Sequence, residues 1–141
     1  MTEAVLRLVL GDGISGLAQA QQRLTSFLTS AGCDAQTRFH VELVVEEVVM
    51  NILHHGQPDD RPAQSWLEAW PTPGHVAIMV EDDGPEFDPL QVVSAPLAER
   101  LEEAAIGGHG ISLVRKYAAG LRYTRTSAGR NRLEFKILRT G

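Results

Sequence analysis

Cysteine, basic charge and long apolar runs are all scarce in this sequence of 141 residues. Because Cys33 is the only cysteine, no disulfide forms within the chain, and a cytoplasmic location is expected. Thirteen basic against 18 acidic residues give a net charge of -5, which argues against a nucleic-acid partner, since such partners usually require a basic surface. The longest nearly apolar stretch, residues 41–53, holds three glutamates and an asparagine, so no membrane span is expected. No basic region followed by an apolar block begins the chain, so no secretory signal is expected either.

Hydrophobic patterning predicts one domain over residues 1–141. A chain of this length buries roughly 68–70% of the surface that its unfolded form exposes, which is enough for a core without disulfides. Strands are predicted over residues 4–10, 65–70, 75–80, 121–126 and 132–138, and helices over residues 15–30, 34–55, 97–105 and 111–119. Short turns join both later strand pairs, which predicts a mixed, mostly antiparallel sheet. With the helices on one face, the fold class is α+β, a two-layer α/β sandwich.

Four residues are candidates for the helix boundaries. Ser15 precedes the first helix and either Asp34 or Thr37 precedes the second, where a short polar side chain can cap free backbone amides. Gly120 follows the last helix, where glycine is favoured as a C-cap. These residues set the expected limits of the three helices.

The helix predicted to end at His55 carries a polar stripe along the edge of its apolar face. Glu47, Asn51 and His55 are spaced by four residues, so they lie on one side of the helix. A carboxylate and an amide at the rim of a core cost free energy unless a ligand uses them. One interpretation makes Glu47 a general base and Asn51 an oxygen ligand of a hard metal ion. The other takes them as solvated residues of an ordinary amphipathic helix.

The strand predicted over residues 75–80 runs into an acidic turn at residues 81–85. Asp82 is a candidate acceptor for a hydrogen bond from the amino group of adenine. Gly84 would let the backbone come close to a flat ring, because it has no side chain. The alternative is an acidic turn of the common kind that follows a strand.

Three glycines, Gly107, Gly108 and Gly110, stand directly before the helix predicted from Ile111. Backbone amides at a helix N-terminus bind anions, so this segment is a candidate phosphate site, and a flexible helix entry is the alternative. The sequence contains no G-x-x-x-x-G-K-[ST] P-loop. A dinucleotide fingerprint beginning at Gly108 fails, because Leu113 stands where the third glycine is required.

Taken in order, these three segments resemble the nucleotide-binding boxes of the GHKL ATPase superfamily. The stripe on the second helix is similar to the box with a metal-binding asparagine, the acidic turn to the first glycine box, and residues 108–111 to the second. The segments on either side of residues 89–106 resemble those of the small bacterial anti-sigma-factor serine/threonine protein kinases. The resemblance covers residues 4–138 and implies a Bergerat-type ATP-binding fold.

The resemblance implies ATP and Mg²⁺ as cofactors and gives each box a role. Glu47 would be the catalytic base that takes the proton from an attacking hydroxyl. Asn51 would hold Mg²⁺ at the phosphates, while Asp82 would read the adenine amino group with Gly84 against the base. The other nucleotide-binding residues that it implies are His55, Gly107, Gly108, Gly110 and Ile111.

Two positions stand apart from the superfamily pattern. Glu86 occupies the place of a second glycine, two residues after Gly84, and puts a negative charge near the site. Asn131 stands where the superfamily often has a threonine near adenine, and no role is assigned to it here.

Residues 89–106 correspond to a lid. In this lid Arg100 would reach a phosphate or a partner, or would belong to a solvated helix face.

The resemblance implies a protein serine/threonine kinase that is also an anti-sigma factor. Its phosphoacceptor would be an anti-sigma-factor antagonist, and a sigma factor would be a second partner. A homodimer is expected. Neither nucleic acid nor a membrane is expected as a partner. The main alternative is a non-catalytic module that binds ATP or ADP and captures a partner protein. The catalytic domain of a sensor histidine kinase fits less well, because 141 residues leave no room for a phosphoacceptor helical hairpin.

Overall fold

A computed structural model describes residues 5–11, 13–55, 63–91 and 110–140. Its elements in chain order are β1 (Leu6–Leu10), α1 (Gly13–Ser30), α2 (Ala35–His55), β2 (Ser65–Pro71), β3 (His75–Asp82), the 3-10 helix η1 (Pro89–Gln91), α4 (Gly110–Tyr117), β4 (Ala119–Arg125) and β5 (Asn131–Leu138). They match the predicted strands and helices to within a few residues. The helix predicted over residues 97–105 lies outside the described residues.

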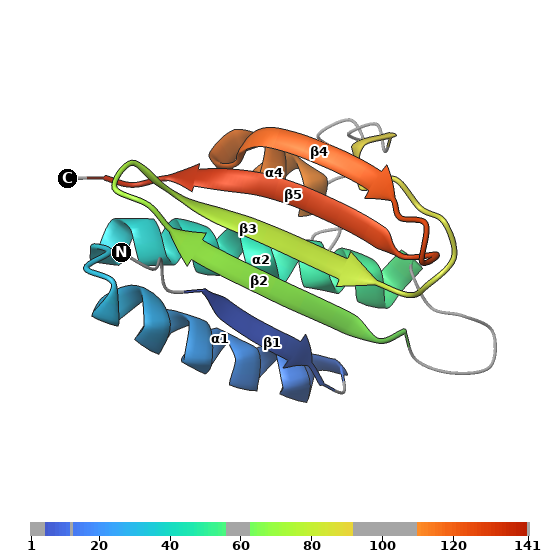
Figure 1. Ribbon diagram of the computed structural model, residues 1–141, viewed down its shortest axis with the longest axis horizontal. Helices are drawn as coiled ribbons and strands as arrows, with labels where there is room; N and C mark the ends of the chain where they lie inside the picture. Colours follow the sequence, from blue (N-terminus) through green and yellow to red (C-terminus); the bar gives the residue numbers. More distant parts are fainter. Residues whose placement is uncertain (1–4, 12, 56–62, 92–109, 141) are drawn as a thin grey trace, which may run out of the picture.

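The strands form one sheet in the order β1-β2-β3-β5-β4 (Figure 1). Every neighbouring pair among these strands is antiparallel, and short turns predict this for the pairs β2–β3 and β4–β5. β5 lies between β3 and β4, and its first residue, Asn131, is opposite Asp82, the last residue of β3. Two residues 49 positions apart in the sequence therefore meet at one end of the sheet.

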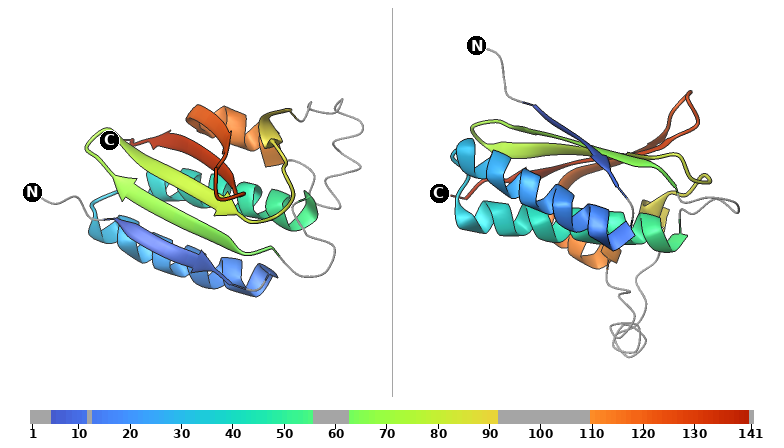
Figure 2. Two further views of the ribbon diagram at one scale, coloured as in Figure 1. Left: turned by 45° about the vertical axis from the view of Figure 1, so that its right-hand side comes forward. Right: turned by 90° about the horizontal axis from the view of Figure 1, so that it is seen from below.

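The described helices α1, α2 and α4 cover one face of the sheet (Figure 2). Alternate residues of β2 and β5 are buried, which is the pattern of an antiparallel sheet with one covered face. α2 turns Val41, Val44, Val45 and Val48 towards the core, and each of them is at most 5% exposed. The structure thus confirms the α+β two-layer sandwich with its helices on one face.

α4 packs against α2 at the side of the domain where the pocket described below opens. Val114 of α4 is 1% exposed, and the ring of Tyr117 stacks on His40 of α2 with centroids 4.7 Å apart. This contact holds the last residue of α4 against the N-terminal part of α2. No helix in the described part of the chain is both long and apolar enough to cross a membrane.

The structure corrects two of the predicted helix boundaries. Asp34 is the N-cap of α2, because its Oδ1 accepts a hydrogen bond from the backbone N of Thr37 at 2.9 Å. The prediction for Ser15 is wrong, since α1 begins before it and Ser15 is helical. The prediction for Gly120 is also wrong: α4 ends before it, and Gly120 takes a φ of 62° within β4, where the pairing with β5 shifts in register.

Asp34 also ties the C-terminal segment to α2. Thr140 Oγ1 donates to the two carboxylate oxygens at 2.8 and 2.6 Å, and the backbone N of Thr140 donates to Thr37 Oγ1 at 3.0 Å. The hydrogen bonds that the Asp34 carboxylate accepts, first from Thr140 and then from Thr37, lower the pKa of Asp34 from its ordinary 3.8 to about 2.

Replacement of Asp34 by asparagine is expected to make the free energy of unfolding depend less on pH between about pH 6 and pH 2. A carboxylate whose pKa is lower in the folded state adds stability above its unfolded value of 3.8 and loses it as the pH falls towards 2. Urea unfolding of the wild type and Asp34→Asn, measured from about pH 6 down to about pH 2, should therefore show the wild-type advantage shrinking with pH. A difference that stays constant over this range would contradict the assignment.

Candidate functional site

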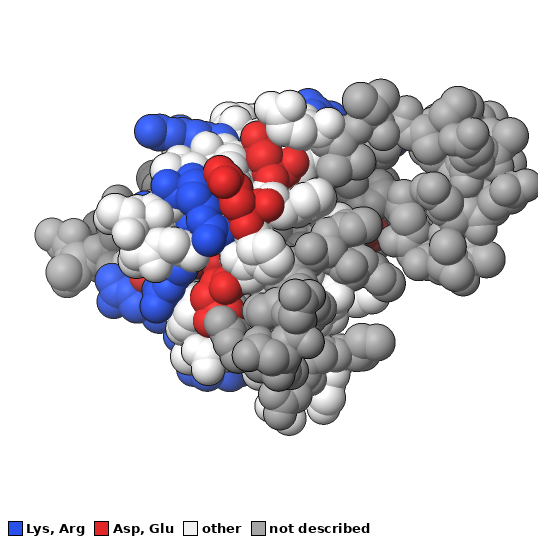
Figure 3. All heavy atoms as spheres, turned by 90° about the vertical axis from the view of Figure 1, so that its right-hand side faces the viewer, with Lys and Arg blue, Asp and Glu red and all other residues white. Residues whose placement is uncertain are grey.

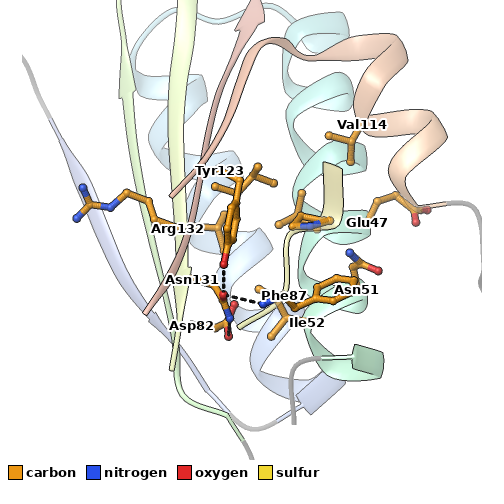
Figure 4. A pocket seen from close by; sticks show the side chains of 13 residues that line it. Glu47, Asn51, Ile52, Asp82, Phe87, Val114, Tyr123, Asn131 and Arg132 are labelled. Atoms are coloured by element: carbon orange, nitrogen blue, oxygen red, sulfur yellow. Dashed lines mark hydrogen bonds between the residues drawn. The ribbon is translucent and has the colours of Figure 1, made fainter. Parts of the chain in front are cut away.

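A pocket opens between α2 and the end of the sheet at which β3 stops and β5 begins (Figure 4). Its lining consists of Glu47, Val48, Asn51, Ile52, Val80, Asp82, Phe87, Pro89, Val114, Tyr123, Asn131, Arg132 and Leu133. About half of these side chains are apolar, and polar groups stand on both the helix side and the sheet side. Such a mixture is typical of small-molecule sites.

Glu47 and Asn51 stand on the helix side of the pocket (Figure 4). Their spacing of four residues brings both side chains to the same stripe of α2, and both are half-buried. Val48 and Ile52, which follow them in the sequence, form the apolar wall beside them. The helix therefore presents a carboxylate and an amide oxygen, a donor set that suits a proton acceptor and a hard cation.

Asp82 stands on the sheet side and is 5% exposed. Its Oδ1 accepts hydrogen bonds from the backbone N of Gly84 at 2.9 Å and from Asn131 Nδ2 at 3.0 Å. Burial raises the pKa of Asp82, and these two hydrogen bonds oppose the rise. A carboxylate buried at the edge of a pocket is costly in the absence of a ligand, which makes Asp82 a candidate for ligand binding.

Side chains of β4 and β5 hold the turn after β3 against the sheet through hydrogen bonds to its backbone. Gly84 is buried, and its carbonyl oxygen accepts from Arg125 Nη1 at 2.9 Å. The backbone N of Phe87 donates to Asn131 Oδ1 at 3.0 Å, which places the Phe87 ring in the pocket. Glu86, at the position of the second glycine, is exposed and does not line the pocket. The departure from the superfamily pattern therefore leaves the pocket wall intact.

Asn131 is a pocket residue to which the sequence assigns no role. It is 5% exposed, lines the pocket and stands at the centre of the hydrogen bonds on the sheet side (Figure 4). Two sequence signals mark it: it stands where the superfamily often has a threonine near adenine, and it is a polar residue at an inward-facing position of a strand, next to the turn that precedes β5. The partners of this residue depend on the register between β3 and β5, which the sequence alone does not define.

Several of the predicted site residues lie outside the described residues or at the end of a described helix. Gly107 and Gly108 lie outside the described residues, as does Arg100. Gly110 and Ile111 are the first residues of α4, and His55 is the last residue of α2. The structure therefore brings together Glu47, Asn51, Asp82 and the turn at Gly84, while the roles predicted for the others stay predictions.

Acidic and basic side chains lie beside one another on the surface at this end of the molecule (Figure 3). Glu81, 5% exposed, accepts from Arg132 Nε at 2.5 Å and from Arg130 Nη1 at 3.3 Å. The Arg130 guanidinium also lies 3.9 Å from the centroid of the Trp66 ring. These contacts pair charges of opposite sign on the face of the sheet opposite to Asp82.

Comparison with known families shows what kind of domain holds this pocket. Residues 14–137 match the family described as the histidine kinase-like ATPase domain. The chain belongs to this family. The match runs from α1 to β5 and includes both sides of the pocket, so ATP binding is the general function of the domain.

A curated relative gives a narrower comparison. The serine/threonine-protein kinase BtrW of Bordetella bronchiseptica is 36% identical over 91 residues, which is 64% of this chain and 64% of the relative. The histidine kinase-like ATPase domain described here thus matches less than two thirds of that protein.

Replacement of Asp82 by asparagine should weaken ATP binding by about tenfold to a hundredfold, because a hydrogen bond to a buried charged group is worth roughly 1.5–3 kcal/mol. The amide keeps the shape of the side chain and an oxygen for the Gly84 and Asn131 donors, so the fold should persist. Isothermal titration with ATP and Mg²⁺ measures the change.

The neighbouring Asp83→Asn is the matched control, because Asp83 Oδ1 accepts from the backbone N of Gln64 at 2.8 Å and Asp83 does not line the pocket. Equal ATP affinities for Asp82→Asn and the wild type would remove Asp82 from the binding site.

Proposed function

We propose that this domain is an ATP-dependent serine/threonine protein kinase that phosphorylates an anti-sigma-factor antagonist and also acts as an anti-sigma factor. The observation that carries the proposal is that Glu47 and Asn51 project from one stripe of α2 into the same pocket as Asp82. Phosphoryl transfer needs a bound nucleotide, neutralised phosphate charge and a base near the nucleophile. The pocket offers a residue suited to each task, and the kinase relative supports the same reaction.

Asp82 would recognise the base of the nucleotide. Its buried carboxylate accepts hydrogen bonds and therefore favours a base edge that carries an amino group, as adenine does. Val80 and Leu133 of the neighbouring strands lie beside it in the pocket and offer apolar contact to a flat ring. Gly84 leaves room for the backbone to come close to that ring.

Glu47 would act as the general base. As the hydroxyl oxygen of a serine or threonine forms its bond to the γ-phosphorus, the proton passes to the Glu47 carboxylate. The bond between this phosphorus and the oxygen that bridges to the β-phosphate breaks, and ADP leaves. A positioned base of this kind contributes about 10²–10⁴-fold to a rate.

Asn51 would hold Mg²⁺ through its amide oxygen. The side chain fits this role, since Mg²⁺ prefers oxygen ligands and takes few of them from the protein when phosphates are present. The metal would neutralise phosphate charge, which a chain with a net charge of -5 does not do by itself. Asn51 would thus orient the phosphates towards Glu47, one turn earlier on α2.

The partner proteins belong to the same proposal and rest on the resemblance to anti-sigma-factor kinases. The unphosphorylated antagonist would occupy this domain, and its phosphorylation would free the domain to capture a sigma factor. A homodimer and a cytoplasmic location are expected for such a switch.

Replacement of Glu47 by glutamine should separate catalysis from binding. The glutamine keeps the size of the side chain but cannot take a proton, so phosphotransfer should fall by about 10²–10⁴-fold while the ATP affinity stays within about twofold. The measurement uses the antagonist obtained by co-purification from native cells, labelled ATP, and mass spectrometry to locate the phosphate on a serine or threonine.

Glu46→Gln provides the control, because Glu46 is exposed on the same turn of α2 and does not line the pocket. It should transfer phosphate at the wild-type rate. Wild-type transfer by Glu47→Gln would overturn the base assignment. If the wild type binds ATP and the partner but transfers nothing, the non-catalytic capture module becomes the correct function.

A further inference from the structure

The side chain of Asn131 uses both ends of its amide in hydrogen bonds within the protein. Nδ2 donates to Asp82 Oδ1 at 3.0 Å and to the carbonyl oxygen of Pro85 at 2.8 Å. Oδ1 accepts from the backbone N of Phe87 at 3.0 Å, from the Tyr123 hydroxyl at 2.6 Å and from Arg125 Nη1 at 3.2 Å. One buried side chain therefore joins the end of β3, the turn that follows it, and β4.

These contacts define how Asp82 meets a ligand. Among the described residues, the two groups that donate to Asp82, Gly84 N and Asn131 Nδ2, both bind Oδ1. Two donors on one oxygen fix the rotation of the carboxylate and leave Oδ2 as the oxygen that can accept from a bound base. They also favour the ionised form of a group whose pKa burial raises.

Asn131 also holds the turn that carries the unusual Glu86. Its two contacts to the backbone fall on the residues immediately before and after Glu86, namely Pro85 O and Phe87 N. A glycine at this position would leave the turn free to take several conformations. Here the amide of Asn131 fixes the turn, and with it the Phe87 ring that lines the pocket.

We propose that Asn131 is a positioning residue that acts through Asp82 and so establishes the preference of the pocket for a base with an amino group over one with an oxo group. The inference rests on the proposed function, in which Asp82 reads the base. Without the Nδ2 donor, the carboxylate can rotate or take up a proton. A protonated carboxyl group donates a hydrogen bond, which suits an oxo group as well as an amino group.

The test compares ATP with inosine triphosphate, which carries an oxo group in place of the amino group. Dissociation constants for both, with Mg²⁺, are measured on the whole chain as wild type, Asn131→Asp and Asn131→Ala. The wild type should prefer ATP by at least about tenfold, the equivalent of roughly 1.4 kcal/mol. In both variants this preference should fall to within about twofold.

Asn131→Asp is the decisive variant, because it has the same shape and keeps an oxygen for Phe87 N, Tyr123 and Arg125 while it replaces the amide donor with a carboxyl group. Two carboxyl groups 3.0 Å apart favour the uptake of a proton, so the ionised Asp82 loses its support. Thr124→Ala is the control for a change in β4: Thr124 follows Tyr123, so its side chain points to the opposite face of the sheet, and the preference for ATP should stay at the wild-type ratio. Thermal unfolding of each variant shows that the protein is folded.

The ratio of the two constants separates positioning from a general structural role. If Asn131→Asp weakens both nucleotides equally and keeps the wild-type ratio, Asn131 only supports the fold and the inference is overturned, while the proposed function stands. If the wild type binds neither nucleotide, or both equally, Asp82 does not read the base, and the proposed function and this inference both fail.

Discussion

The site depends on a carboxylate that is kept inside the protein. Asp82 is 5% exposed at the end of β3, where burial by itself would favour its protonated form. The hydrogen bonds from Asn131 and from the Gly84 backbone counteract this effect, and both of them bind Oδ1. Base recognition, the shape of the turn and the sheet-side wall of the pocket all follow from this one arrangement.

The rest of the fold supports this carboxylate from two directions. The antiparallel register of β3 and β5 places Asn131 opposite Asp82, and β4 adds Tyr123 on the far side of β5. On the other side of the pocket, the packed valines of α2 fix the rotation of the helix, which turns Glu47 and Asn51 towards the cavity. The residue proposed to read the base thus belongs to the sheet layer, and the residues proposed for metal binding and catalysis belong to the helix layer.

Local patterns in the sequence predict the elements of this fold and residues on both sides of its pocket. The spacing of Glu47 and Asn51 is a property of one helix, and Asp82 is marked by its place between an apolar strand and a glycine. Asn131 could not be found in this way, because its partners come from β3 and β4 through a pairing that local patterns do not encode. Ser15 and Gly120 failed as helix boundaries, since α1 already begins at Gly13 and Gly120 lies within β4, where the pairing with β5 shifts in register.

A crystal structure of the chain with Mg²⁺ and a non-hydrolysable ATP analogue tests the central claim most directly. The account predicts that the amino group of adenine lies within hydrogen-bonding distance of Asp82 Oδ2 while Asn131 Nδ2 still donates to Oδ1. It also predicts that the metal contacts the Asn51 amide oxygen. An adenine ring bound elsewhere, or bound in this pocket without contact to Asp82, would contradict it.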